Sequence, residues 1–300
     1  MSETLTFGPA HSRASLKRVF DGLLSTVDRA ALVRADPVEL VHRYDDPHDQ
    51  EVVGLIVAMM AYGRVSSIKA KAEQVLHALG PHPARAVQQG RRGRRLSGFV
   101  YRFQKQEDLP RFLAAVGRVR RRHGSLAAAF AAQVEPDAAT YAPAMAAFVH
   151  VLGEAVSGPM SYGLRFMLPD CSGGGASKRL CLFLRWMIRP ADGLDLGAWR
   201  TLAPGLSPAR LIMPLDTHVA RISRYIGLTE RRSNDLRCAL EITGALSDLA
   251  PDDPLVYDMA LCHLGISGQC PKRRDVLKCQ GCPIRRVCRL GPPPAGWPKP

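Results

Sequence analysis

The stretch Met213-Pro214-Leu215-Asp216-Thr217-His218-Val219-Ala220-Arg221-Ile222 decides the expected fold, because an apolar segment with a proline runs directly into a helical pattern. Asp216 stands at the junction, where a carboxylate accepts backbone N–H groups of the first helical turn and is held ionised. Helix capping alone would explain such a residue. An anchored, ionised carboxylate can also stabilise an oxocarbenium-like sugar or orient a water molecule, as carboxylates do in glycoside cleavage.

Apolar residues recur at helical spacing on both sides of this stretch, and period-two alternation bounded by turn residues is nearly absent. The sequence therefore predicts an all-α fold. A glycine at position 227, behind Ile226, is typical of a helix end. The expected helices span residues 16–27, 38–43, 50–61, 67–79, 109–122, 125–133, 138–155, 177–188, 217–226, 233–247 and 253–264.

The chain has 300 residues, of which 46% are hydrophobic and 23% charged, so it can bury a sizeable core. Its formal net charge of +14 attracts polyanions, and nucleic acid is the first partner to consider. The longest nearly apolar run, residues 52–62, is too short to cross a bilayer, and the polar N-terminus does not resemble a signal peptide. We expect a cytoplasmic, nucleoid-associated monomer without membrane contact.

Four of the eight cysteines cluster near the C-terminus with the spacing C-x8-C-x2-C-x5-C: Cys270, Cys279, Cys282 and Cys288. Four thiolates in one short segment can converge on a soft metal centre. A zinc ribbon usually pairs two C-x2-C hooks, and only one is present, so a [4Fe–4S] cluster is favoured over zinc. Four unligated thiols are a third reading, since the cytosol is reducing. Many Lys and Arg residues surround the segment and can balance a four-thiolate cluster.

The other four cysteines lie at helical or loop positions, and each is expected to be a small buried hydrophobe: Cys171, Cys181, Cys238 and Cys262.

A glycine-rich turn runs into a helix at residues 168–178, Leu-Pro-Asp-Cys-Ser-Gly-Gly-Gly-Ala-Ser-Lys. The backbone amides of Gly173, Gly174 and Gly175 can hold a phosphate, aided by the helix N-terminus. Lys178 falls in the first helical turn, where a cation opposes the helix dipole. A partly desolvated lysine there has a lowered pKa and can attack a sugar carbon as a free amine. The alternative is an exposed lysine that binds a phosphate.

Two basic runs predict a phosphate-binding surface. Residues 91–95, Arg-Arg-Gly-Arg-Arg, lead into Phe99-Val100-Tyr101-Arg102-Phe103, and residues 120–122 are three consecutive arginines. Basic side chains interleaved with aromatic ones are typical of nucleic-acid binding. The plainer interpretation is solvated charge on a loop and at a helix C-terminus, where cations are favourable.

The string Pro214-Leu215-Asp216-Thr217-His218-Val219, the four-cysteine segment and the helical body together resemble the helix-hairpin-helix DNA glycosylase superfamily, its endonuclease III branch in particular, over roughly residues 40–290. Within it, the chain looks closest to a bacterial family described as a domain of unknown function. That family is marked by Ala61-Tyr62-Gly63-Arg64, Leu184-Arg185-Trp186-Met187-Ile188-Arg189 and Pro214-Leu215-Asp216-Thr217-His218.

The resemblance implies two helical lobes, double-stranded DNA kinked between them, a flipped nucleotide and a catalytic aspartate at Asp216. In bifunctional members a Schiff-base lysine is added, here Lys178. Arg64 would plug the hole left by the flipped base, and Tyr62 or Trp186 would stack on a base, although an aromatic at helical spacing is more often core. The DNA contacts that the resemblance implies are Gly173, Gly174, Gly175, Arg64, His218 and Arg221.

The resemblance also implies domains: helices over residues 1–45 that pack on the C-terminal lobe, a barrel-like domain with a remodelled hairpin over 46–215, a cluster domain over 216–290 and an irregular tail over 291–300. Three features depart from the superfamily pattern. The glycines do not follow Leu168-Pro169 directly, the first cysteine gap is longer than usual, and residues 191–211, which contain Trp199, look like an insertion. Such an insertion would loop out or reshape the pocket.

The sequence thus predicts a base-excision DNA glycosylase, with AP-lyase activity if Lys178 forms a Schiff base, and with the cluster in a structural role. Two alternatives belong to other classes. One is a catalytically silent iron–sulfur module with the same fold that binds DNA or RNA, suggested by the altered hairpin. The other is an electron-transfer or redox-sensing protein.

Overall fold

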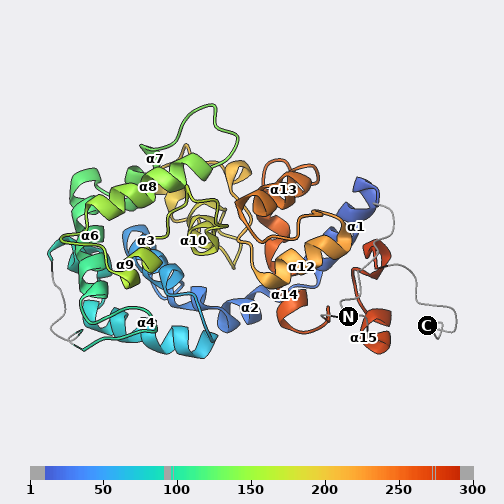
Figure 1. The fold of residues 1–300 in the computed structure, drawn as a ribbon, viewed down its shortest axis with the longest axis horizontal. Helices are drawn as coiled ribbons and strands as arrows, with labels where there is room; N and C mark the ends of the chain where they lie inside the picture. The colour runs from blue at the N-terminus through green and yellow to red at the C-terminus, as the bar shows by residue number, and fades with distance from the viewer. Residues whose placement is uncertain (1–10, 91–95, 97, 272, 274, 291–300) are drawn as a thin grey trace. The chain divides into compact units, whose positions relative to one another are not determined.

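A computed structural model describes residues 11–90, 96, 98–271, 273 and 275–290 of the chain. It is all-helical, with 59% helix, and the residues described contain no strand beyond an isolated antiparallel bridge between Tyr101 and Gln104. This confirms the all-α expectation. In chain order (Figure 1) the elements are α1 Arg13–Ser25, α2 Arg29–Ala35, η1 Pro37–Leu40, α3 Pro47–Met59, α4 Val65–Leu79, α5 Pro83–Gln88, α6 Asp108–His123, α7 Leu126–Ala131, α8 Ala142–Glu154, α9 Tyr162–Met167, α10 Lys178–Ile188, α11 Trp199–Leu202, η3 Pro208–Arg210, α12 Thr217–Ile226, α13 Leu236–Ser247, η4 Pro254–Tyr257, α14 Asp258–Ile266, α15 Val276–Gln280 and η5 Arg285–Val287.

The chain divides into two compact units. Unit 1 is discontinuous and combines residues 1–27 with residues 212–300, whereas unit 2 is the continuous segment 28–211. Residues 28–45, expected with the N-terminal helices, therefore belong to unit 2, and the division falls between Leu211 and Ile212. The expected tail, residues 291–300, lies outside the described residues.

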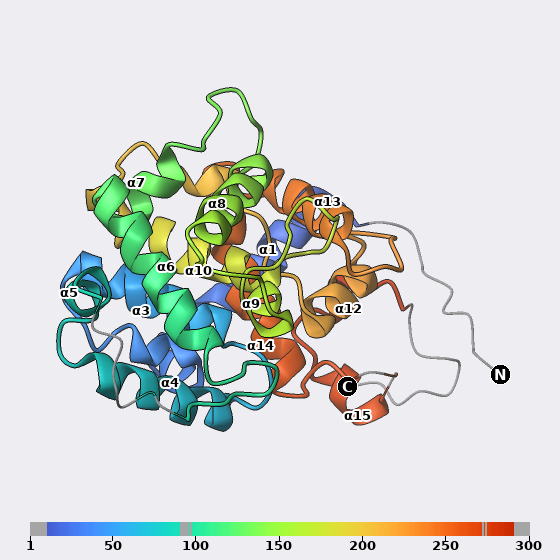
Figure 2. The same ribbon diagram turned by 60° about the vertical axis from the view of Figure 1, so that its left-hand side comes forward.

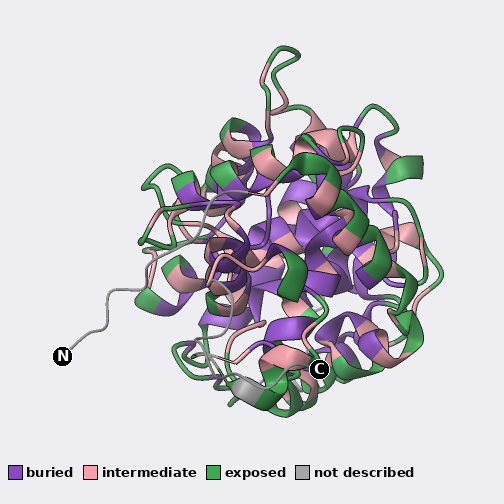
Figure 3. Cartoon of the chain, turned by 90° about the vertical axis from the view of Figure 1, so that its right-hand side faces the viewer, coloured by how far each residue is buried: buried purple, intermediate pink, exposed green. Residues whose placement is uncertain are grey.

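The core of unit 2 is built on the packing of α3 against α10. Every residue of α3 from Glu51 to Met59 is buried, so this part of the helix is covered on all sides. Gly54 allows the close approach, because a Cβ at that position would lie 2.9 Å from Met187 Cε and 3.4 Å from the Phe183 ring. Many of the other helices are buried on one face and exposed on the other (Figure 3).

A buried carboxylate, Glu51, organises the polar interior of unit 2. It pairs with the guanidinium of Arg120 and accepts the backbone N–H groups of Leu126 and Ala127 at 3.0 and 2.9 Å, which completes the N-terminus of α7. The indole Nε1 of Trp199 donates to the same carboxylate at 3.0 Å. Every charge in this interior group thus has a partner, as burial demands.

Two sequence expectations are corrected by this group. Arg120 was expected on a phosphate-binding surface, but it is buried in its pair with Glu51 because a polar residue of α3 needs a counter-charge inside the core. Trp199 was expected in an insertion that loops out or reshapes a pocket. Looping out was wrong, because Trp199 is fully buried, with its ring 5.4 Å from that of Phe130 and 5.2 Å from that of Phe183.

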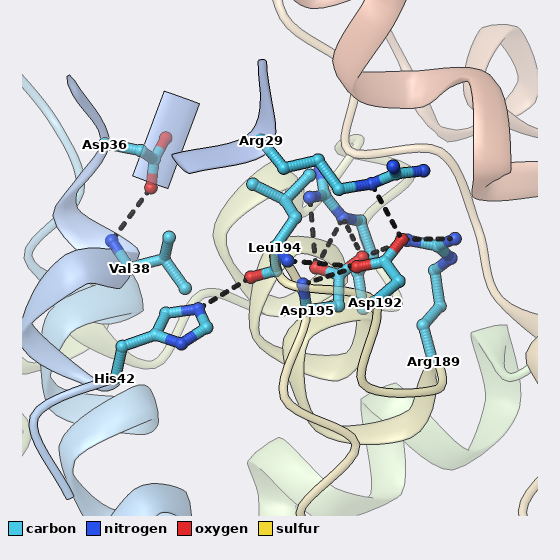
Figure 4. A network of polar contacts seen from close by, with 9 residues as sticks. Arg29, Asp36, Val38, His42, Arg189, Asp192, Leu194 and Asp195 are labelled. Atoms are coloured by element: carbon cyan, nitrogen blue, oxygen red, sulfur yellow. Dashed lines mark hydrogen bonds and ion pairs between the residues drawn. The ribbon is translucent and has the colours of Figure 1, made fainter. Parts of the chain in front are cut away.

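The segment after α10 is fixed by an arginine–aspartate network (Figure 4). Asp195 is buried and pairs with Arg185, whose Nη2 lies 3.0 Å from Oδ1, and with Arg189. Asp192 accepts the backbone N–H of Asp195 at 3.0 Å and lies 3.9 Å from Arg29. These contacts hold residues 192–195 against the C-terminal end of α10.

Unit 1 brings together segments from the two ends of the chain. The blue helix α1 and the orange helices α12 and α14 lie close together in Figure 1, and α1 packs against α14 and η5. The rings of Phe20 and Tyr257 are 5.1 Å apart, and the Tyr257 hydroxyl donates to Asp21 at 2.9 Å. Unit 1 is therefore held by an aromatic contact and a hydrogen bond between α1 and η4.

Most expected helices are present, with ends shifted by a few residues. The helix expected over residues 217–226 has those bounds, and Gly227 ends it in a left-handed conformation at φ 78°. Residues 38–43 form only the short 3-10 helix η1, and 253–264 are divided between η4 and α14. No helix among the described residues is both long and apolar enough to span a membrane.

Candidate functional site

Asp216 has the position expected for it, at the junction between the apolar segment and α12. Asp216 has extended backbone angles and caps α12, with its Oδ1 accepting the N–H groups of His218 and Val219, both at 2.8 Å. The non-helical segment before it is held at Met213, whose N–H donates to the buried Thr243 hydroxyl at 3.0 Å. Asp216 is half-buried, and its carboxylate is anchored by the start of α12.

Helix α14 shapes the surroundings of this carboxylate. The thiol of Cys262 lies 3.9 Å from Asp216 Oδ2, at the limit of a sulfur hydrogen bond. Gly265, one turn further along, packs directly on His218: a Cβ there would overlap the His218 Cβ and lie 2.9 Å from Nδ1. Neither residue was predicted as part of the site. Cys262 was expected to be a small buried hydrophobe, and Gly265 lies just beyond the helix expected over residues 253–264.

His218 and Arg221 were expected to contact DNA. The His218 side chain is half-buried, and its Nδ1 has no hydrogen-bond partner among the described residues. Arg221 donates through Nη2 to the carbonyl of Cys270 at 2.8 Å, while its buried Nε lacks a partner in the described part of the chain. Arg221 thus joins α12 to the first residue of the cysteine segment.

The four C-terminal cysteines of unit 1 lie within electrostatic range of one another. Burial, together with smaller contributions from the thiols of Cys282, Cys288 and Cys279, raises the pKa of the Cys270 thiol to about 11. The pKa of Tyr225 on α12 is raised in the same way, chiefly by burial and also by three of these thiols. No three His, Cys, Asp or Glu side chains of the described residues are grouped closely enough to hold a metal ion.

The donor set itself suits a thiolate-bound centre. All four candidate ligands are sulfur atoms in one short segment, which is the set that zinc and iron–sulfur clusters take. The unpartnered Nε–H of Arg221 beside Cys270 is a donor that an anionic centre would satisfy. The chemistry of the residues therefore fits either centre, without deciding between them.

Of the remaining cysteines, Cys171, Cys181 and Cys238 are buried, as expected of small hydrophobic residues. Cys262 is only half-buried and is the exception, because it borders Asp216.

The glycine-rich turn is exposed at all three glycines, and Gly174 has a φ of 80°. Asp170 folds the turn by accepting the Ser172 hydroxyl at 2.5 Å and its N–H at 2.8 Å, and these bonds lower the pKa of the Asp170 carboxyl. Ser177 is left-handed at φ 45°, and its side chain makes no capping bond to α10. The turn therefore enters α10 without the side-chain cap that most helices have.

Lys178 begins α10 as expected and is half-buried. It lies in unit 2 within the electrostatic field of Asp36, which caps η1 by accepting the Val38 N–H at 2.9 Å. Burial raises the pKa of Asp36, while the charges of Arg185 and Lys178 act in the opposite direction. Asp36 and Lys178 thus lie within electrostatic range of each other.

The other predicted contacts are divided between surface and core. Arg64 is exposed at the start of α4, and Arg121 donates to the Gln88 carbonyl at 2.5 Å. Trp186 is buried, as expected for a core aromatic, whereas Tyr62 is half-buried. The arginine run at residues 91–95 lies outside the described residues.

Comparison with known proteins identifies the family of the chain. No curated protein and no solved structure matches the chain. A family model described as "Protein of unknown function (DUF2400)" matches residues 36–267, a range that includes Lys178 and Asp216 and ends before Cys270. Because that range is well over half of the chain, the protein belongs to the DUF2400 family.

Proposed function

We propose that this protein cleaves the N-glycosidic bond of a damaged or mismatched base in double-stranded DNA. The observation that carries the proposal is the anchoring of Asp216, whose Oδ1 takes two backbone hydrogen bonds at the start of α12. These two bonds fix the position of the carboxylate, and a fixed negative charge is what a positively charged sugar transition state requires. The net charge of +14 suits a polyanionic substrate.

In this proposal the target nucleotide is flipped out of the duplex, and Asp216 stabilises the sugar as positive charge develops at C1′. His218, seated on Gly265, and the thiol of Cys262 hold the surroundings of the carboxylate in place. The resemblance to endonuclease III-like glycosylases supports this assignment through the string Pro214-Leu215-Asp216-Thr217-His218-Val219.

Lys178, which belongs to unit 2, is the proposed nucleophile for an associated lyase activity. Its free amine forms a bond to C1′ while the bond from C1′ to the base breaks, and the base leaves with the electron pair and takes up a proton. Loss of a proton from nitrogen and opening of the sugar ring then give a Schiff base. Asp36 lies within electrostatic range of Lys178, and a carboxylate there would be a candidate acceptor for the proton of the lysine.

The four C-terminal cysteines would hold a [4Fe–4S] cluster, with zinc as the alternative, through Cys270, Cys279, Cys282 and Cys288. Such a centre would supply a fixed, cross-linked conformation of the segment. Arg221 ties that segment to the helix that Asp216 caps. Iron, sulfide and zinc analysis of the purified protein, beside a Cys282→Ser variant, distinguishes the two centres from unligated thiols.

The first experiment compares Asp216→Asn with Asp235→Asn in a base-release assay on duplexes that each carry one damaged or mismatched base. Asp235 is a matched control because it caps α13 by accepting the Cys238 N–H at 2.8 Å. Both variants lose a charged cap, but only Asp216→Asn should lose base release, by roughly 10²–10³-fold for a lost transition-state charge contact. Equal activity in the two variants would contradict the proposal.

The second experiment is borohydride trapping on duplex DNA with one abasic site, wild type beside Lys178→Ala and the control Lys71→Ala on α4. An adduct that requires Lys178 supports the lyase step. Equal trapping by all three proteins would show that the nucleophile is another lysine. Binding without adduct or base release on any duplex would favour the alternative, a catalytically silent binding module, for which the uncapped turn before α10 is the supporting observation.

A further inference from the structure

Four aromatic rings of unit 2 form a cluster that is open to solvent. The ring platform consists of Tyr62, Phe103, Tyr162 and Phe166. Phe103 lies at its centre, with ring centroids 4.6 Å from Phe166, 5.7 Å from Tyr162 and 6.1 Å from Tyr62. Tyr62 and Phe166 are 4.8 Å apart, edge to face. These rings come from α9, from the loop after α3 and from a tight turn.

The tight turn presents the platform's central ring. Tyr101 and Gln104 pair as an isolated antiparallel bridge, with the Gln104 N–H donating to the Tyr101 carbonyl at 2.9 Å. Arg102 and Phe103 form the tip between them, and Arg102 adopts a φ of 51°, which is unusual for a residue other than glycine. A residue held in this region marks a constraint that the surroundings maintain.

The turn is fastened on two sides. The hydroxyl of the buried Tyr101 donates to the Tyr62 carbonyl at 2.6 Å. The buried Gln104 accepts the Tyr62 hydroxyl and donates through Nε2 to the Gly163 carbonyl at 3.3 Å. The platform is therefore preorganised rather than a set of loosely held rings.

Helix α9 is fixed beside the turn, next to α6 (Figure 2). Ser161 caps α9 and donates to the buried Asp108 at 2.5 Å, and Asp108 also accepts the Lys105 N–H at 2.8 Å. Gly163 has no room for a side chain, because a Cβ there would overlap Asp108 and stand 3.0 Å from Gln104 Cα. Tyr162 and Phe166 thus share one supported edge of the platform.

The outer rings are exposed to solvent, whereas aromatic rings that only fill a core are buried. Tyr162 is 65% exposed and Phe103 41% exposed. Beneath them the guanidinium of Arg179 lies 4.5 Å from the Phe166 ring and 5.2 Å from the Tyr62 ring, and it donates to the Met59 carbonyl at 2.6 Å. A stacked arginine supports the inner rings, so the outer ones are not needed to fill a cavity.

The charges around the rings indicate the chemistry of a ligand. Arg102 reaches over both Tyr62 and Phe103, at 5.8 and 5.9 Å from the ring centroids. Arg64 and Arg165 are exposed on the flanking residues. Cations repel a cationic ligand and attract an anionic one, so a planar group attached to a phosphate fits this surface best.

We propose that the ring platform binds an unpaired base of a single-stranded nucleic acid, with Arg102 on the adjacent phosphate. Exposed rings can stack only on bases that are not already stacked in a duplex, and ring faces next to arginines are how single strands are bound without sequence preference. The proposal goes beyond base excision from duplex DNA and does not rest on it, because no group of the platform takes part in that chemistry.

The test measures the affinity of the full-length protein for a labelled oligo-dT and for the same strand paired with its complement. Phe103→Ala and Tyr162→Ala should each weaken oligo-dT binding roughly 5- to 150-fold, the range for one lost base–ring stack. Phe103→Trp should retain it. The matched control is Val100→Ala, since Val100 is 49% exposed and its side chain is not an aromatic ring.

Two further measurements locate the contact. Arg102→Gln should lower the slope of log affinity against log salt by about 0.7, the value for one phosphate contact on a single strand. Photocrosslinking of a strand with 5-iodouracil should label Phe103, Tyr162 or both. Oligo-dT contains no damaged or mismatched base, so its binding is measured separately from base release, and a failure of the proposed glycosylase does not affect this test.

The proposal is overturned if Phe103→Ala and Tyr162→Ala bind oligo-dT as tightly as Val100→Ala does, or if the crosslinks fall only outside the platform. A dimer that light scattering detects in the wild type, and that both ring variants abolish, would assign the surface to a second copy of this chain and would also overturn it.

Discussion

Trp199 donates its indole N–H to the buried carboxylate of Glu51, 3.0 Å away, across 148 positions of sequence. Removing that donor by Trp199→Phe leaves a buried acceptor with one bond fewer, and we expect the free energy of unfolding to fall by about 1.5–3 kcal/mol. Urea unfolding measures this loss, provided that the slope of the unfolding free energy against urea concentration is the same for the variant and the wild type. Arg200→Gln, at the exposed neighbouring residue, is the control and should be neutral.

The arginine–aspartate network predicts a larger effect. Asp195→Asn removes the charge that both Arg185 and Arg189 contact in the interior, and leaving buried charges unpaired costs about 3–5 kcal/mol. Asp192→Asn, at a partly exposed side chain, should cost much less. Thermal and urea unfolding of the two variants compare the costs, and equal losses would show that burial does not decide the effect.

The pH dependence of Asp192 has a definite sign. Burial opposes ionisation, but backbone N–H groups and Arg189 outweigh it, so the pKa of Asp192 is lowered from 3.8. A depressed carboxyl pKa adds stability above the unfolded value, and that stability is lost as pH falls through the folded pKa. Asp192→Asn should therefore be less stable than wild type at pH 7, and the gap should close below about pH 3.8.

We expect the pH dependence of stability that comes from Asp36 to have the opposite sign. Its pKa is raised above 3.8, with burial as the largest cause, so the folded state binds the proton more tightly than the unfolded state. The wild type loses stability as pH rises through this range. Asp36→Asn can still accept the Val38 N–H, and it should exceed the wild type in stability at pH 7 and match it at acid pH. A gap that does not change with pH would contradict the prediction.

Two helix glycines of unit 1 give a matched pair. Gly265→Ala drives a Cβ into His218, so it should destabilise unit 1 and disturb the surroundings of Asp216. Gly244→Ala on α13 meets nothing within 4 Å and should stabilise by about 0.5–1 kcal/mol through helix propensity. Circular dichroism melts of both variants provide the test. Base release should fall only in Gly265→Ala.

Long amphipathic helices could be read from the sequence because their own periodicity defines them. The cap at Asp216 was equally predictable from local sequence, because a carboxylate directly before a helix can accept the backbone N–H groups of its first turn. Helices α2, α5 and α9 are six or seven residues long and were not predicted, because so short a segment is helical only through packing that the sequence does not display.

Side-chain partners were the least predictable feature. Arg120 stands in a run of three arginines that reads as surface charge, yet the run turns with the helix and places its first member inward, toward Glu51. Trp199 follows a Gly- and Asp-containing stretch typical of a loop, and only the distant Glu51 explains its burial. Contacts across such distances in sequence leave no local pattern.

The order of synthesis follows from the division of the chain. Unit 2 is continuous, so all its residues leave the ribosome before Ile212 does, and it can fold during translation. Helix α1 emerges before unit 2 but packs on α14 and η5, which emerge after unit 2. The apolar face of α1, with Phe20, therefore lacks these native partners until α14 and η5 have been synthesised, and a nascent protein stalled before α14 would expose it to chaperones.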